Sequence, residues 1–324
     1  RNQGIWQGGI LPKTENALGA IIDIEGITGP GGYSPVIIPI RFHRVGTGPV
    51  PPARRVTMAQ LISGSEVSQL VEVEGVVWSA RRLYDGKLGM ELMVEGQLCQ
   101  LEFMRNRGID PDQYVDASVR VRGFSRPIAN FRSEAVRLRL TVPSKDYLDV
   151  LQPPPKDPFQ APKVALNELL AFSREPDRFH RKVTQGVVNF VLPGQFFFLQ
   201  EGTAGVRVEC TDTNIHVGDV VEVAGFVDSS RYLASLTEAL ARVVGHAPLP
   251  PGVPVTLDQI LHPQIVRRSA SAKEADCAGG LVRLRGLIGD IEHRKSDKMF
   301  TLYLVTEDHR FQAFLPVTNM VSSV

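Results

Sequence analysis

Residues 182–226 read KVTQGVVNFVLPGQFFFLQEGTAGVRVECTDTNIHVGDVVEVAGF, and this stretch decides the fold. Apolar residues alternate with polar or charged ones through several short runs, which is the period of half-buried β-strands. The turn at 201–204 joins two runs as a hairpin, and a last run follows at 231–241. We therefore expect an all-β domain of five short strands in about 70 residues, the Greek-key barrel called the OB-fold.

The same pattern recurs along the chain at intervals of roughly 100 residues, which indicates a tandem repeat. One phrase of four residues followed by a glycine stands at 71–77 (VEVEGVV), 182–188 (KVTQGVV) and 282–288 (VRLRGLI). A second phrase is interleaved with it at 22–27 (IDIEGI), 119–124 (VRVRGF) and 221–226 (VEVAGF). The glycine in each phrase predicts a bulge or bend where a strand curls around its barrel.

Proline-rich segments separate the repeats. They lie at 48–52, 152–158 and 248–254, and such sequences form stiff extended spacers. A short helix is expected after each of them, and Thr57 and Thr256 are the expected N-caps of two of these helices. We expect the apolar residues of the helices to dock on a barrel; they are Leu166, Leu169, Leu170, Phe172, Leu257, Ile260 and Leu261.

These boundaries divide the chain into four parts. Residues 1–66 are the C-terminal part of a first OB-like unit with its linker. Residues 67–174 and 175–277 are a second and a third unit, each with a linker helix, and residues 278–324 are the first strands of a fourth. Since the pattern is interrupted at both ends, we expect the chain to be a piece of a longer protein.

The composition points away from catalysis and metal binding. The net charge is +1, so no general attraction to nucleic acid or to an anionic membrane is expected. The three cysteines, Cys99, Cys210 and Cys277, are far apart and form no CxxC pair. The chain has no phosphate-binding glycine loop, no HExxH and no GxSxG motif. We predict no catalytic residue, no cofactor, no metal site and no membrane-spanning segment.

Four arginines are the first candidate binding residues. Arg120 and Arg122 alternate on one expected strand, and Arg137 and Arg139 alternate on the next. Antiparallel neighbours would place all four on one outer face, which is how OB barrels hold nucleic acid. A solvated face is the favoured alternative, because the corresponding positions of other repeats carry acids, as at Asp23 and Glu25.

Two phenylalanines are the other candidates. Phe196 and Phe198 lie on one face of their expected strand, and Phe197 lies on the other. One set must belong to the core. The other set is expected either to be buried between domains, which is the favoured alternative, or to stack on a ligand.

Three stretches resemble a known family. They are FFFLQEGTAGV at 196–206, VGDVVEVAG at 217–225 and IEGITGPGGYSPVI at 24–37. They are similar to the tandem OB-like modules that precede the membrane anchor in bacterial sensor histidine kinases, where an (L/F)FVQDGTAGI hairpin precedes GDRVEVEG and GPGGYSPV. In the first unit, residues 4–6 match the strand after that hairpin. The segment LGMELMVEG at 88–96 departs from the hairpin pattern.

The resemblance implies an extracytoplasmic, periplasmic sensory region of a membrane-bound kinase. Its partners would be an unidentified small ligand or protein and the downstream transmembrane and kinase regions. The kinase's phosphoacceptor histidine and ATP-binding glycine boxes are absent from this sequence. Two alternatives remain open: a nucleic-acid-binding OB array, since similar modules occur in secreted nucleases, and an adhesion or scaffold module.

Overall fold

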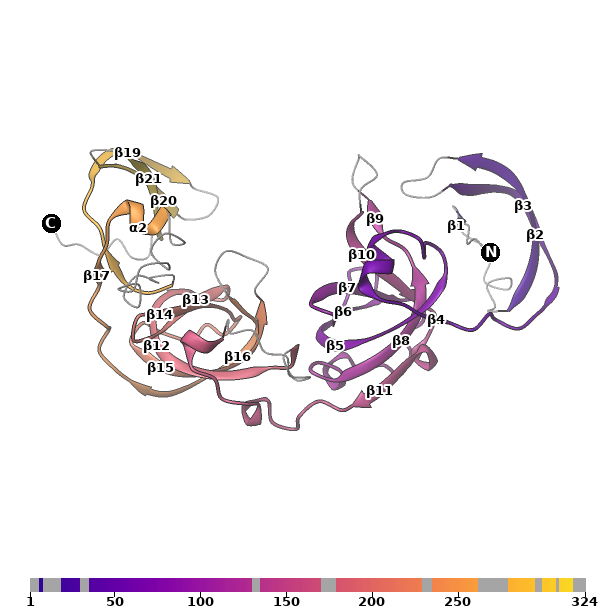
Figure 1. Cartoon of the computed structure of the whole chain (residues 1–324), viewed down its shortest axis with the longest axis horizontal. Coiled ribbons are helices and arrows are strands. Elements are labelled where there is room, and N and C mark those ends of the chain that lie inside the picture. The colour runs from indigo at the N-terminus through magenta and orange to yellow at the C-terminus, as the bar shows by residue number, and fades with distance from the viewer. Residues whose placement is uncertain are drawn as a thin grey trace. The chain divides into compact units, whose positions relative to one another are not determined.

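The computed structural model describes residues 6–7, 19–29, 35–129, 135–169, 179–228, 235–261, 279–294, 299–306 and 309–316. Strands dominate this part of the chain, and its α-helices are five residues long (Figure 1). The chain divides into two compact units, Arg1–Lys156 and Asp157–Val324. The prediction of an all-β protein with short linker helices is confirmed.

The third repeat forms a closed barrel of five strands. These are β12 (Lys182–Leu192), β13 (Phe196–Glu201), β14 (Ala204–Glu209), β15 (Asp219–Asp228) and β16 (Ser235–His246). Their order is β12-β13-β14-β16-β15, and only β14 and β16 run parallel. Counted along the barrel this is 1-2-3-5-4, closed by a pairing of strands one and four, so it is an OB-fold.

The glycine of the repeated phrase marks a close approach of two strands. A Cβ atom at Gly186 would lie 2.7 Å from the carbonyl oxygen of Gln200 on β13. Gly75 of the second barrel faces Met93 in the same way, at 2.4 Å. A larger residue would push neighbouring strands apart at this bend, which explains why the phrase carries glycine.

The second repeat has the same pairing. Its barrel strands are β5 (Leu70–Arg82), β6 (Leu88–Val94), β7 (Gln97–Phe103), β8 (Ser118–Ser125) and β10 (Ala135–Val142). Strands β7 and β10 run parallel, and β8 closes the barrel against β5. The accessory elements are β9 (Ile128–Ala129), β11 (Leu148–Gln152), η1 (Pro111–Gln113) and η2 (Lys145–Tyr147). Segment 88–96 forms the first strand and the turn of the β6–β7 hairpin despite its unusual sequence.

The first and last repeats contain parts of the same pattern. Strand β1 (Trp6–Gln7) runs parallel to β3 (Val36–Thr47), which pairs antiparallel with β2 (Ala20–Gly29). These pairings are those of strands three, five and four. At the other end β19 (Leu287–Arg294), β20 (Met299–Val305) and β21 (Arg310–Pro316) form an antiparallel meander, as strands one to three do.

Each linker joins the barrel that follows it. Strand β4 (Arg54–Arg55) pairs in parallel with β5, Lys163 bridges to Val183 of β12, and β17 (Val253–Pro254) pairs with β18 (Val282–Arg283). Linker residues therefore extend the first strand of the next repeat as a short parallel edge.

The first two linker helices also pack in the core of the following barrel. Met58 and Leu61 of α1 (Met58–Ile62) are buried in the core of the second barrel, and Leu166 and Leu169, in and after η4 (Leu166–Glu168), in that of the third. In α2 (Leu257–Leu261), Leu257 is buried but Ile260 is 41% exposed. Leu170, Phe172 and the side chain of Leu261 lie outside the described residues. The expected boundaries after 66 and 174 therefore separate these helices from the cores they fill.

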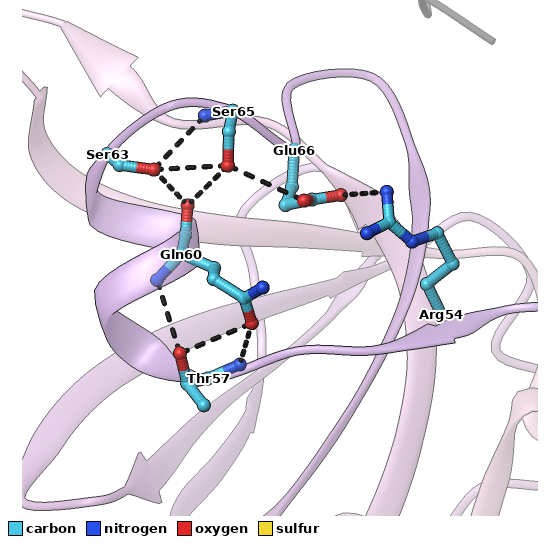
Figure 2. Close-up of polar contacts among 6 residues, drawn as sticks. All are labelled: Arg54, Thr57, Gln60, Ser63, Ser65 and Glu66. Atoms are coloured by element: carbon cyan, nitrogen blue, oxygen red, sulfur yellow. Dashed lines mark hydrogen bonds and ion pairs between the residues drawn. The ribbon is translucent and has the colours of Figure 1, made fainter. Parts of the chain in front are cut away.

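Helix α1 begins at a capping box, which Figure 2 shows. Thr57 Oγ1 accepts from Gln60 N at 3.3 Å, and Gln60 Oε1 accepts from Thr57 N at 2.9 Å. Thr256 and Gln259 repeat both bonds before α2. The predicted N-caps are confirmed. After the C-terminal end of α1, the buried carboxylate of Glu66 pairs with Arg54 at 3.3 Å and ties this segment to β4 (Figure 2).

Candidate functional site on the third barrel

The four predicted arginines do not gather into one binding face. Arg120 and Arg122 lie on β8 between β5 and β11, whereas Arg139 is level with Gln100 of β7. Strand β10 meets β8 only near residues 140–141, so Arg137 and Arg139 lie farther along the barrel. The geometry thus forms two separate pairs.

Carboxylates neutralise most of these arginines. Arg120 donates two hydrogen bonds to Glu74, at 2.9 and 2.8 Å, and this carboxylate raises the pKa of the guanidinium. Arg122 pairs with Asp149 at 3.0 Å and Arg139 with Glu102 at 3.0 Å. Arg137 is exposed and makes no ion pair with the described residues. Two more arginines, Arg126 and Arg132, lie in the segment between these strands; Arg126 is exposed, and Arg132 lies outside the described residues.

The two predicted phenylalanines lie on the outside of the third barrel. Phe197 is 2% exposed and belongs to the core, whereas Phe196 and Phe198 are partly exposed on the opposite face of β13. Phe190 of β12 joins them, and the three ring centroids are 5.8–6.1 Å apart. These distances are those of interacting aromatic rings. We call Phe190, Phe196 and Phe198 the aromatic cluster.

A charged pair borders the aromatic cluster on β14. The guanidinium carbon of Arg207 lies 4.3 Å from the centroid of the Phe196 ring, within cation–π range. Arg207 also pairs with Glu209 at 3.3 Å, and its Nε is buried without a hydrogen-bond partner among the described residues. The outer face of strands one to three therefore combines flat apolar rings with a guanidinium and a carboxylate.

A β-bulge in β12 places a pair of side-chain amides, Asn189 and Gln200, beside the aromatic cluster. Val188 pairs with Leu199 and Phe190 with Phe198, so Asn189 is an extra residue on β12. Asn189 and Gln200 are 9% and 2% exposed, and the Asn189 Nδ2 donates to Gln200 Oε1 at 2.8 Å. Bulges commonly redirect a side chain near binding sites. Here the bulge presents an amide pair beside the aromatic cluster.

The second barrel has no equivalent of this face. In the third barrel the first cross-strand pair after the bulge is Phe190–Phe198, and in the second barrel it is Ser79–Glu91. Ser79 therefore corresponds to Phe190, and Glu91 corresponds to Phe198. By the same registers the remaining positions, Phe196 and Arg207, correspond to Gly89 and Gln100. The fold does not require aromatic residues here, since a closed barrel forms without them. The cluster of three rings therefore distinguishes the third barrel from the second.

The remaining chemistry of the described residues is structural. They contain no group of three histidine, cysteine or acidic side chains arranged to hold a metal ion. Burial raises the pKa of the Cys99 thiol to about 12 and also raises that of Cys210. None of the described helices is long and apolar enough to cross a membrane.

The sequence analysis named Phe196 and Phe198 as candidates, and the structure places Phe190 and Arg207 beside them on the same outer face. Phe190 and Arg207 lie on neighbouring strands, and only the strand register brings them together. The signal that identifies Phe190 is the bulge at Asn189, because it shifts the alternation of β12 by one residue.

Comparisons with known proteins do not assign a family. No family model and no curated protein matches the chain. Among solved structures, the hypothetical protein ygiW from E. coli is 10% identical, covers 26% of this chain and 92% of its own, and has a TM-score of 0.21. A murine DNA-binding protein bound to double-stranded DNA is 9% identical over 56% and 98%, with a TM-score of 0.26. The tetrameric p202 HIN2 is 7% identical over 55% and 97%, with a TM-score of 0.22. Likenesses this weak carry no argument about function.

Proposed function

We propose that this chain is a non-catalytic binding region whose third barrel holds an uncharged ligand on its outer face. The observation that carries the proposal is the aromatic cluster beside Arg207 and Glu209. In OB-folds the face of strands two and three binds oligonucleotides and oligosaccharides. Here those strands are β13 and β14, and they carry two of the rings and the charged pair.

The charges favour an oligosaccharide over a nucleic acid. Binding along a phosphate backbone requires free cations, because the affinity comes from counterion release. Arg207 is instead paired with Glu209 and stacked on Phe196. A sugar ring offers an apolar face to the phenylalanines and hydroxyls to the charged pair, so it matches both features of the site.

The proposal extends to the setting of this region. The motifs at 24–37, 196–206 and 217–225 support an extracytoplasmic, periplasmic sensory region of a membrane-bound histidine kinase. Ligand binding to a barrel would then shift the equilibrium of a downstream kinase by its differential affinity for two states. Reading the complete gene tests this part: a transmembrane helix and kinase core downstream support it, and a nuclease domain contradicts it.

The binding site itself is tested with sugars. We would screen this chain on an array of neutral oligosaccharides and titrate the tightest binder by calorimetry against wild type and Phe198→Ala. We expect the variant to bind about tenfold more weakly, since truncating a central aromatic side chain of a binding site typically costs more than about 1 kcal/mol.

The matched control is Phe314→Ala on β21, which removes another phenylalanine that is 56% exposed. It should bind like wild type. Failure of every oligosaccharide to bind, or equal affinity of Phe198→Ala and wild type, would refute the oligosaccharide site. Salt-dependent binding of single-stranded DNA that Phe198→Ala weakens would replace the sugar with a nucleic acid.

A further inference from the structure

The amide end of the third barrel's outer face is already occupied. Gln200 Oε1 accepts a hydrogen bond from the backbone N–H of Leu281 at 2.9 Å, and Asn189 Nδ2 donates to the carbonyl oxygen of Gly279 at 3.0 Å. These two backbone groups belong to residues two positions apart. A parallel β-strand also bonds a C=O and an N–H two residues apart on its neighbour, and here two side-chain amides make the equivalent bonds.

Glycines allow the backbones to approach. A Cβ atom at Gly205, the residue of β14 that pairs with Gln200, would lie only 2.2 Å from the carbonyl carbon of Gly279. Gly279 itself has a φ of +75°, a conformation that side chains disfavour. The contact thus needs glycine on both sides. We call residues 279–281 the strap.

The strap also leads directly into the first strands of the following repeat. The carbonyl oxygen of Leu281 accepts from Val253 N at 3.0 Å, and Arg283 accepts from Val255 N at 3.1 Å. Leu281 is therefore bonded to the barrel through its N–H and to the linker through its C=O. Strands β18 and β19 continue directly from it.

The second barrel lacks these groups. Strand register matches Asn189 with Trp78, Gln200 with Met93, and Gly205 with Leu98. The subsite is therefore another feature that distinguishes the third barrel, and it lies on the same face as the aromatic cluster.

We propose that Asn189 and Gln200 form a docking subsite for a glycine-containing backbone segment, that the strap is its occupant, and that docking is coupled to the aromatic end of the face. Asn189 directly precedes Phe190, and Phe198 is two residues before Gln200 on β13. A movement of the rings is passed to both amides through short segments of backbone. The docking stands alone, whereas the role of the coupling in ligand response rests on the proposed function.

The coupling between ligand binding and strap docking must act in both directions. A ligand that binds more tightly when the strap is docked must stabilise the docked strap by the same factor. Because the strap begins the fourth repeat, occupancy of the third barrel would alter how firmly the next module is attached.

Hydrogen exchange of the Leu281 amide, resolved by NMR, tests the docking. We expect Gln200→Met to speed this exchange at least tenfold, since methionine keeps the volume and removes the acceptor. The second barrel carries methionine at the same position, so the substitution suits the fold. The control is Gln185→Met, an exposed position of β12, which should leave Leu281 unchanged.

Gly205→Ala provides an independent disruption, because it keeps both amides and displaces the strap by a steric clash. Slow exchange of buried Val208 in each variant shows that the barrel is folded. Unchanged Leu281 exchange in both Gln200→Met and Gly205→Ala would overturn the docking subsite.

The coupling is tested without a ligand. Phe198→Leu should change Leu281 exchange at least threefold, and Phe314→Leu should not. If Phe198→Leu has no effect, the coupling is refuted while docking stands. Neither result depends on whether a sugar binds, so a failure here is distinguishable from a failure of the proposed function.

Discussion

Replacing Glu222 by glutamine should loosen the third barrel from its linker. The Glu222 side chain on β15 is only 4% exposed. Its Oε1 accepts from Lys163 Nζ of the linker at 2.7 Å, and its Oε2 accepts from Arg242 Nε of β16 at 2.7 Å. Glutamine keeps the shape of the side chain but has one acceptor oxygen in place of two. Its NH2 group would therefore face either Lys163 or Arg242, and a donor would stand against a cation.

The structure sets the size of the effect. Two hydrogen bonds to charged groups contribute about 1.5–3 kcal/mol each when fully buried. The side chains of Lys163 and Arg242 are 71% and 51% exposed, so water replaces much of what they lose. We expect Glu222→Gln to lower the free energy of unfolding of this barrel by about 2 kcal/mol. This corresponds to on the order of 10 °C in its melting temperature.

The effect should depend on pH in a defined direction. The hydrogen bond from Lys163, followed by that from Arg242, lowers the pKa of Glu222 below that of an ordinary carboxyl group. A lowered pKa stabilises the fold above the unfolded-state pKa of about 4.3 and loses this contribution as the pH falls through the folded-state value. The difference between wild type and Glu222→Gln should therefore be constant near neutrality and shrink in acid.

Hydrogen exchange by mass spectrometry in increasing urea resolves the individual barrels. Trp6 and Trp78 both lie outside the third barrel, so their fluorescence follows the rest of the chain and should be unchanged. Glu25→Gln is the matched control, because Glu25 is 66% exposed in its pair with Arg41. It should cost less than about 1 kcal/mol. An equally small effect of Glu222→Gln, or one that grows in acid, would refute this account.

Three further predictions address the other surfaces. Single-stranded DNA titrated at two salt concentrations should bind weakly to wild type. Replacing the four arginines Arg120, Arg122, Arg137 and Arg139 by glutamine should change this affinity little. Tight binding that falls steeply with salt and is lost in this variant would contradict the view that carboxylates neutralise these arginines. Cys99 should resist iodoacetamide at pH 8 until the chain unfolds, as peptide mapping would show, because burial raises its thiol pKa to about 12. Phe197→Ala should destabilise the third barrel by about 3–5 kcal/mol in urea-dependent hydrogen exchange, whereas a loss below about 1 kcal/mol would place this ring outside the core.

The fold was predictable because its signals are local. Alternation of period two, the hairpin at 201–204 and the glycine phrases depend on residues close in sequence, and they identify strands and bends directly. The spacing of the phrases extended the assignment to the second barrel, where the hairpin sequence is unusual. Even the N-caps at Thr57 and Thr256 could be read, since a capping box spans only four residues.

The candidate site was only partly predictable because it depends on register. Period two places Phe196 and Phe198 on one face, but it cannot show which face is the core. Once a bulge is present, counting along β12 places Phe190 on the wrong side. The expectation that the four arginines share one face is wrong for a related reason. Strands β8 and β10 are paired over only two residues, so alternation along each strand does not bring the arginines of the two strands together.

Contacts between distant segments were beyond the sequence patterns altogether. Nothing near Gln200 indicates that Leu281 lies against it, 81 residues later. The same holds for the linker helices, which the sequence placed with the preceding unit because they follow it directly. Their apolar residues show that they are buried, but only the contacts show in which core.

The attachment of each linker to the next barrel decides where the chain can be divided. A fragment that starts at 67 lacks Val56, Met58 and Leu61, so one end of its barrel core would be open to water. A fragment that starts before Arg54 keeps the edge strand and the capped helix as well. The structural unit is therefore spacer, helix and then barrel, and a fragment cut in that order keeps its core closed.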